Sequence, residues 1–110
     1  MRLFLYGTLL DPACLARHIG PGGGGVGVVL PDWRRVTLAG GRWPTLVRGR
    51  SPVAGGLPGL MIDVPAAGFA RLNAYEGPRY ALRRVVVRRG SRHSCAWAWI
   101  APGGTRRTWP

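Results

Sequence analysis

The chain has 110 residues, enough for one domain with a buried core, and 46% of them are hydrophobic, which excludes a largely disordered protein. All 16 basic residues are arginine and only four residues are acidic, so the formal net charge is +12. No apolar run approaches the roughly 18 residues of a membrane span, and the hydrophobic segment at residues 2–5 is too short for a signal peptide. We therefore expect a cytoplasmic protein with no membrane partner.

The arginines are scattered along the chain and form no long basic segment. They recur as pairs at residues 34–35, 83–84, 88–89 and 106–107. The exclusive use of arginine, with abundant glycine, alanine and proline, is also what a GC-rich genome produces whatever the function. We expect attraction to anionic molecules but no dedicated nucleic-acid partner; a nucleic-acid binder driven by arginine is an alternative.

The N-terminal segment predicts a buried strand followed by a helix. Residues 3–6 are aliphatic and aromatic, and they end at Gly7, as a buried strand does. After a turn, Asp11 is suited to cap a helix, and Pro12 fits its first turn, where the missing N–H costs no hydrogen bond. The helix is expected over residues 13–19.

A glycine-dense loop is expected at residues 20–27. It matches the spacing of a dinucleotide-binding fingerprint, but a helix and not a strand precedes it. A Walker loop is excluded because it requires a lysine and the chain has none. We interpret this segment as a connector.

The middle of the chain predicts short strands at residues 26–30, 33–38, 45–47 and 60–62. Residues 49–59 are rich in turn formers, and the stretch from 57 to 60 is expected to interrupt the strand that follows. A helix opens at Pro65 and extends to Glu76. This helix places Glu76 beside its inward face, close to its C-terminal end.

The C-terminal third predicts a hairpin. Residues 80–89 carry three valines between arginines, residues 94–100 alternate large and small side chains, and residues 90–92 form the turn between them. Residues 103–110 are expected to be frayed. The whole chain, residues 1–110, is therefore expected to form a single α+β domain of five to seven strands. Its sheet would be small, mixed but largely antiparallel and barrel-like, with two short flanking helices.

Glu76 is the only glutamate in the chain and the main candidate for chemistry. One carboxylate suffices when the substrate carries its own nucleophile, because it can take a proton from the attacking group and pass it to the leaving group. Partial burial beside aromatic neighbours such as Tyr80 would raise its pKa toward neutrality. The alternative is a surface carboxylate paired with Arg79 or Arg83.

The turn at the end of the first strand is the second candidate. It consists of Tyr6, Gly7, Thr8 and Leu9. A glycine at a strand end frees the N–H groups that follow it, and successive N–H groups can bind a carboxylate without any basic side chain. An ordinary strand-terminating turn is the alternative.

Cysteine and histidine give no sign of a metal centre. Cys14 and Cys95 lie far apart in the sequence, and His18 and His93 do not form a metal-ligand spacing with them. We expect neither a metal nor another cofactor, and no disulfide.

Several segments together resemble the γ-glutamylcyclotransferase-like family, which includes the AIG2-like proteins. Tyr-Gly-Thr-Leu at residues 6–9 directly follows an N-terminal strand, and Tyr-Glu-Gly-Pro-Arg-Tyr at residues 75–80 precedes a valine-rich strand. Residues 41–46, 53–56 and 95–100 are similar, in order, to the family's aromatic-proline segment, one of its strand starts and its closing aromatic strand.

The resemblance implies a small barrel-like α+β fold with a cavity, and an enzyme that acts on a γ-glutamyl amine or peptide. It implies that Glu76 is the acid/base, that residues 6–9 hold the γ-glutamyl group through their backbone, and that Tyr80 lines the cavity. The substrate's own α-amine would attack its γ-carbonyl, releasing 5-oxoproline and an amine or amino acid.

Two departures from the family pattern leave the substrate open. Asn73 stands where the family often has aspartate, and Leu82 stands where it often has arginine. The alternative function is a non-catalytic member of the same fold that binds a small anionic metabolite in the same pocket.

Overall fold

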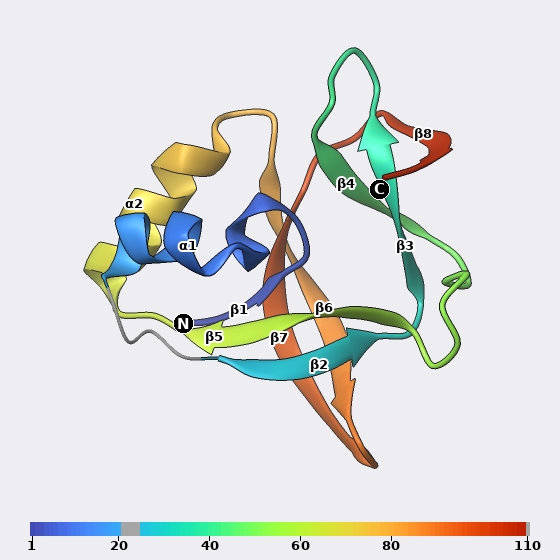
Figure 1. Ribbon diagram of the computed structural model, residues 1–110, viewed down its shortest axis with the longest axis horizontal. Helices are drawn as coiled ribbons and strands as arrows, with labels where there is room; N and C mark the ends of the chain where they lie inside the picture. Colours follow the sequence, from blue (N-terminus) through green and yellow to red (C-terminus); the bar gives the residue numbers. More distant parts are fainter. Residues whose placement is uncertain (21–24, 110) are drawn as a thin grey trace.

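A computed structural model describes residues 1–20 and 25–109 of the chain (Figure 1). Its two helices lie together on one side of the molecule, and the strands form the rest. In chain order the elements are β1 (Arg2–Leu5), a 3-10 turn η1 (Thr8–Leu10), α1 (Pro12–Ile19), β2 (Val26–Leu30), β3 (Trp33–Leu38), β4 (Pro44–Arg48), β5 (Leu57–Asp63), α2 (Ala66–Glu76), β6 (Ala81–Arg89), β7 (Arg92–Ile100) and β8 (Gly104–Thr108).

Five strands close into a barrel in the order β1-β5-β2-β6-β7. Only the β1–β7 contact that completes the ring is parallel; the other pairs are antiparallel. The hairpin of β6 and β7 is the longest, with nine residues in each strand and a register that runs from Ala81 opposite Ile100 to Arg89 opposite Arg92. The predicted fold class, an α+β fold with a mixed, largely antiparallel, barrel-like sheet and two short helices, is confirmed.

A second sheet of three strands, in the order β4-β3-β8, extends from the barrel. Its strand β8 corrects the expectation that residues 103–110 are frayed, and it is the eighth strand where five to seven were expected. Side chains fix it in place: the Thr105 hydroxyl donates to the Thr37 carbonyl at 2.8 Å, and the Trp109 indole donates to the Arg42 carbonyl at 2.8 Å. These partners are distant in sequence, so local pattern does not reveal the strand.

Strand β5 also begins earlier than expected. Residues 57–60 belong to this strand and do not interrupt it. Glycine is accommodated at position 59 because a side chain there would collide with the core. A Cβ on Gly59 would lie 2.5 Å from the ring of Phe4, which is 1% exposed and packs inside the barrel. The glycine therefore marks a close approach between strands and not a turn.

The helices begin and end where local signals place them. The Asp11 carboxylate accepts a hydrogen bond from the Ala13 amide at 3.2 Å, which caps α1 as predicted. The helix α2 ends at Glu76 and is followed by Gly77 in a left-handed conformation, φ 81°. Residues 21–24 of the expected glycine loop at residues 20–27 lie outside the described residues. Neither described helix has the length and apolar character needed to cross a membrane.

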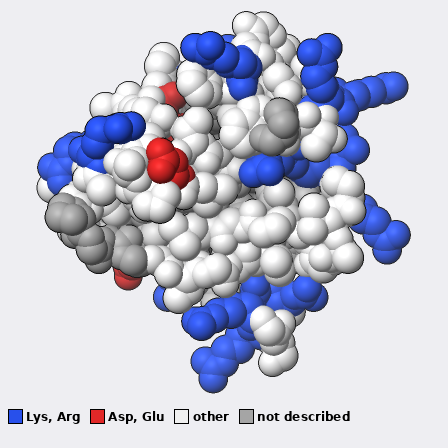
Figure 2. All heavy atoms as spheres, viewed as in Figure 1, with Lys and Arg blue, Asp and Glu red and all other residues white. Residues whose placement is uncertain are grey.

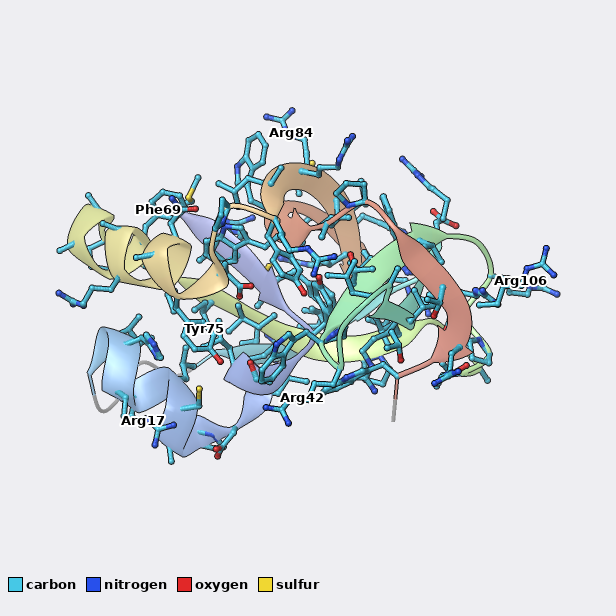
Figure 3. The ribbon with its side chains drawn as sticks, turned by 90° about the horizontal axis from the view of Figure 1, so that it is seen from above. Arg17, Arg42, Phe69, Tyr75, Arg84 and Arg106 are labelled. Atoms are coloured by element: carbon cyan, nitrogen blue, oxygen red, sulfur yellow. The ribbon has the colours of Figure 1, made fainter. Side chains whose placement is uncertain are left out.

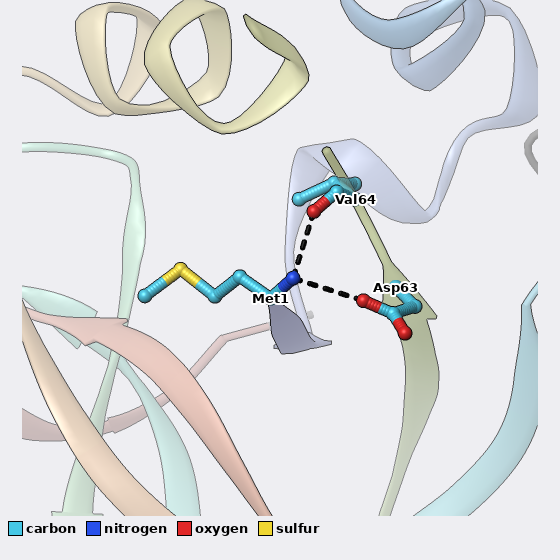
Figure 4. A network of polar contacts seen from close by, with 3 residues as sticks. All are labelled: Met1, Asp63 and Val64. Atoms are coloured by element: carbon cyan, nitrogen blue, oxygen red, sulfur yellow. Dashed lines mark hydrogen bonds and ion pairs between the residues drawn. The ribbon is translucent and has the colours of Figure 1, made fainter. Parts of the chain in front are cut away.

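The start of β1 is held by a small polar network (Figure 4). The amino group of Met1 donates to the Asp63 carboxylate at 2.9 Å and to the Val64 carbonyl at 2.8 Å. Its hydrogen bond and positive charge lower the pKa of the Asp63 carboxyl. Because Asp63 is highly exposed, this pair fixes register more than it adds stability.

Candidate functional site

A cavity of about 270 Å³ opens where the end of β1, the turn η1, the start of β4 and the end of α2 meet. Residues from five separate parts of the chain line it: Phe4, Leu5, Tyr6, Gly7, Thr8, Leu9, Trp43, Pro44, Tyr75, Glu76, Tyr80 and Trp99. All six residues that the sequence singled out, Glu76, Tyr6, Gly7, Thr8, Leu9 and Tyr80, are brought together here.

Among the described residues, Glu76 is the only charged one in the cavity wall. It is the last residue of α2 and is half-buried, and burial raises its pKa to about 7. The alternative, a surface carboxylate paired with Arg79 or Arg83, is not found among the described residues, and the Arg79 guanidinium donates instead to the Ala39 carbonyl at 3.1 Å. Within residues 1–20 and 25–109 no ion pair reaches Glu76. The carboxyl is therefore free to exchange a proton near neutral pH.

Residues 6–9 form another part of the wall. The side chain of Arg35 holds its beginning, donating from Nη1 to the Tyr6 carbonyl at 2.8 Å. A Cβ on Gly7 would lie 2.9 Å from Pro44 Cγ, so only glycine lets the turn pack this closely against β4. In η1 the amide of Leu10 donates to the Gly7 carbonyl at 3.0 Å. The earlier amides of such a turn have no partner within it, which leaves them available to a bound group.

Three tyrosines surround the carboxyl. Tyr6 is buried, and its hydroxyl donates to the Trp99 carbonyl. Tyr80 donates from its hydroxyl to the Pro44 carbonyl at 2.7 Å. The pKa of each of these two phenols is raised, mainly by burial and further by the negative charge of nearby Glu76. Both therefore stay protonated and neutral at physiological pH.

The mouth of the cavity is aromatic. Trp43 and Tyr75 are 47% and 41% exposed, although both line the cavity. The hydroxyls of Tyr75 and Thr8 are 2.8 Å apart, which ties the end of α2 to η1. Figure 3 shows Tyr75 between the two helices and the strands. These two rings are the most exposed of the aromatic residues that line the cavity.

The prediction from sequence omits several cavity residues. Trp43, Pro44, Tyr75 and Trp99 line the wall but were not named as site residues, and Arg35 supports it from outside. Segments that resemble family motifs were the available signal: Trp43 and Pro44 lie in the aromatic-proline segment, Tyr75 lies in the segment at residues 75–80, and Trp99 lies in the closing aromatic strand.

The other chemistry-bearing residues do not build a second centre. Cys14 and Cys95 are both free thiols, so they form no disulfide with each other. The His18 ring nitrogen Nδ1 lies 2.8 Å from the Cys14 carbonyl within α1. In the part of the chain that the structure describes, no three histidine, cysteine or acidic residues are grouped as metal ligands.

Basic charge is concentrated away from the middle of the face seen in Figure 2, which is largely uncharged. No arginine is among the described residues that line the cavity. An anionic group that binds there must therefore rely on backbone and hydroxyl donors, while the arginines outside provide long-range attraction.

Comparison with known families gives a match over nearly the whole chain. Residues 3–109 match the family described as "Gamma-glutamyl cyclotransferase, AIG2-like". No curated protein matches the chain.

Solved structures with the same fold include two from Arabidopsis thaliana and one titled as a cyclotransferase. A protein of Arabidopsis thaliana is 22% identical, with a TM-score of 0.78 over 94% of this chain and 70% of its own. A second Arabidopsis thaliana protein is 26% identical, with a TM-score of 0.75 over 91% of this chain and 61% of its own. A structure titled "Gamma-glutamyl cyclotransferase" is 12% identical, with a TM-score of 0.78 over 96% of this chain and 68% of its own. At 12% identity this last likeness shows the fold alone.

Proposed function

The chain belongs to the gamma-glutamyl cyclotransferase, AIG2-like family, and from this premise we propose that it is a cyclotransferase acting on a γ-glutamyl amine or peptide. The α-amino nitrogen of the γ-glutamyl group forms a bond to its own γ-carbonyl carbon. The bond from that carbon to the leaving nitrogen breaks. The products are 5-oxoproline and a free amine or amino acid, and no atom from another molecule is required.

Glu76 moves the proton in this reaction. The attacking α-amine must lose a proton, and the leaving nitrogen must gain one before it departs as an amine. A carboxyl with a pKa of about 7 serves both steps, because near neutral pH it is present in both protonation states. The observation that carries the proposal is this half-buried carboxyl, unpaired by any described residue and facing the same cavity as residues 6–9.

The rest of the wall orients the substrate. We place the γ-glutamyl α-carboxylate against the backbone of residues 6–9, with Tyr80 beside the reacting carbonyl. Ring closure is intramolecular, so most of the barrier is lowered by holding the amine over the carbonyl in the reactive geometry. Aromatic rings make up half of the described lining residues, and such a wall favours a single bound conformation without further catalytic groups.

The proposal is tested by incubating the protein with a panel of γ-glutamyl amines and dipeptides and measuring 5-oxoproline. We expect release from at least one compound at a rate proportional to protein concentration. The alternative is a non-catalytic member that binds a small anionic metabolite in the same cavity. A compound that raises the melting temperature without any 5-oxoproline release across the panel would support that alternative and contradict the proposal.

The leaving amine is expected to lie against Trp43. In Trp43→Ala we expect KM for a substrate with a bulky apolar amine to rise about 10-fold, with kcat changed less than about 2-fold, because the lost contact binds ground state and transition state alike. The matched control is γ-glutamyl methylamide, which is too small to reach the indole and should show similar kinetics with both proteins. Equal losses on both substrates would show that Trp43 supports the cavity as a whole instead.

A further inference from the structure

Arg35 is a half-buried cation that contacts the turn at residues 6–9 from behind the cavity wall. It lies in β3, and it is not among the described residues that line the cavity. Its Nη1 donates a hydrogen bond of 2.8 Å to the carbonyl of Tyr6, which does line the cavity. The arginine therefore meets the site through the backbone of the turn.

No carboxylate neutralises Arg35 in the part of the chain that the structure describes, where the one ion pair joins the Met1 amino group to Asp63. The Nε atom of Arg35 is buried and has no hydrogen-bond partner among these residues. Burial also lowers the pKa of its guanidinium. Buried charges are normally paired, because removing them from water is unfavourable. A cation kept here without a counter-ion lowers stability, and its charge remains available to an anion in the cavity.

Trp109, directly after β8, orders the Arg35 side chain. The guanidinium carbon of Arg35 lies 5.0 Å from the centre of the Trp109 ring. Two hydrogen bonds fix the tryptophan: its amide donates to the Arg35 carbonyl at 3.4 Å, and its indole donates to the Arg42 carbonyl at 2.8 Å. Stacking uses one face of the planar guanidinium and leaves its N–H edge for the Tyr6 carbonyl. The C-terminal strand thus helps to hold the arginine against the turn.

The hydrogen bond from Arg35 also sets the direction of the next amide. The Tyr6 carbonyl and the Gly7 N–H belong to one planar trans peptide unit, so they point in opposite directions. The carbonyl faces Arg35 behind the wall, and the N–H then faces the side of the cavity. No described carbonyl accepts a hydrogen bond from this N–H. A positive charge on the carbonyl polarises the peptide unit and makes the N–H a stronger donor.

We propose that Arg35, ordered by Trp109, is a positioning residue that gives the turn at residues 6–9 its affinity for the α-carboxylate of the substrate. This inference rests on the proposed function, which places that carboxylate against the turn. Arg35 does not touch the ligand; it acts through the Tyr6–Gly7 peptide unit and through its unneutralised charge. The one charged residue among those described in the wall is the carboxyl of Glu76, so a cation behind the turn offsets the repulsion of a second carboxylate.

NMR titration of the isotope-labelled full chain carrying Glu76→Gln tests this with γ-glutamyl methylamide. The Glu76→Gln background slows turnover, so the titration measures binding. Adding Arg35→Gln should weaken binding at least ~10-fold, and it should shift the Gly7 amide resonance even without ligand. The matched control is Arg34→Gln, which removes the same charge from the neighbouring half-buried position on the opposite face of β3. It should change the affinity less than ~2-fold, and equal losses in the two variants would overturn the proposal.

A second ligand separates positioning of the turn from general support of the fold. The compound 4-aminobutyryl methylamide is γ-glutamyl methylamide without the α-carboxylate, and Arg35→Gln should change its affinity less than ~2-fold. Equal losses on the two ligands would show that Arg35 only supports the cavity, which overturns the proposal. Arg35→Lys keeps a donor and the charge, so it should restore most of the affinity for γ-glutamyl methylamide.

Trp109→Ala carries the test if Arg35→Gln does not fold. It leaves the arginine in place but frees its side chain, so binding of γ-glutamyl methylamide should weaken about 3-fold. An unchanged affinity would contradict the role of Trp109 in ordering the arginine.

Failure of this inference is distinguishable from failure of the proposed function. If binding depends on Arg35 as expected but the wild type releases no 5-oxoproline, the positioning role stands and the cyclotransferase proposal fails. If 5-oxoproline is released while Arg35→Gln binds as tightly as its parent, only the positioning role fails. A parent protein that does not bind γ-glutamyl methylamide would overturn the positioning role as well, because the turn would not hold this carboxylate.

Discussion

Glu76→Gln is expected to lower kcat/KM for 5-oxoproline release by about 1,000-fold while leaving the fold intact. Glutamine has nearly the same shape but cannot accept the proton of the attacking amine or return it to the leaving nitrogen. Because Glu76 has no ion pair to lose among the described residues, the substitution breaks no charged contact. The measurement is initial rate against substrate concentration for both proteins, with circular dichroism to show that the variant is folded.

The matched control for this experiment is Asp32→Asn. It removes the same charge from an exposed residue outside the cavity wall, so it should keep close to full activity. If Glu76→Gln kept the wild-type rate, the proton-transfer role would be wrong even if the protein were a cyclotransferase. If both variants lost activity, net charge and not the Glu76 carboxyl would be responsible.

The barrel strands and both helices could be predicted because their signals are local. Asp11 and Pro12 mark the start of α1, and Gly77 marks the end of α2. The alternating tryptophans and alanines of β7 give its two faces, with Ala96 and Ala98 buried inside the barrel. In each case the sequence pattern and the structural cause lie within a few residues of each other.

The parts that could not be predicted depend on contacts between distant segments. Gly59 reads as a turn former, and only the position of Phe4 on a neighbouring strand shows why glycine is needed within β5. Residues 104–108 are mostly threonine and arginine, and their pairing with β3 depends on partners more than 60 positions away.

The candidate site divides in the same way. Glu76 and residues 6–9 stand out through residue type and turn chemistry, and their order in the chain carries the family resemblance. Arg35 gives no such sign, because its relation to the site is a hydrogen bond to the Tyr6 carbonyl. Sequence identifies the groups that do chemistry more readily than the groups that hold them.

The same carboxyl makes stability depend on pH. The pKa of Glu76 is about 7 in the folded chain, against 4.5 for an ordinary glutamate, because burial disfavours its charged form. Between these values the folded chain keeps a proton that the unfolded chain has lost. The stabilisation from this group is therefore complete below pH 4.5, and it is lost as the pH rises through 7.

Replacing Glu76 with glutamine should remove this loss. At pH 4 the two proteins should be similarly stable, whereas at pH 8 Glu76→Gln should be more stable by about 2 to 3 kcal/mol, a gain of roughly 10 °C in melting temperature. Denaturant unfolding of both proteins across this range measures the difference. Asp32→Asn corrects for the change in net charge and should show a difference of no more than about 0.5 kcal/mol.

A stability difference between wild type and Glu76→Gln that stayed constant with pH would contradict this prediction. It would mean that the Glu76 carboxyl is well solvated and that its pKa is not raised, so it would be poorly suited to act as an acid/base near pH 7. A protein that gains stability and loses activity through one substitution would instead show that its buried carboxyl is kept for chemistry at a cost to the fold.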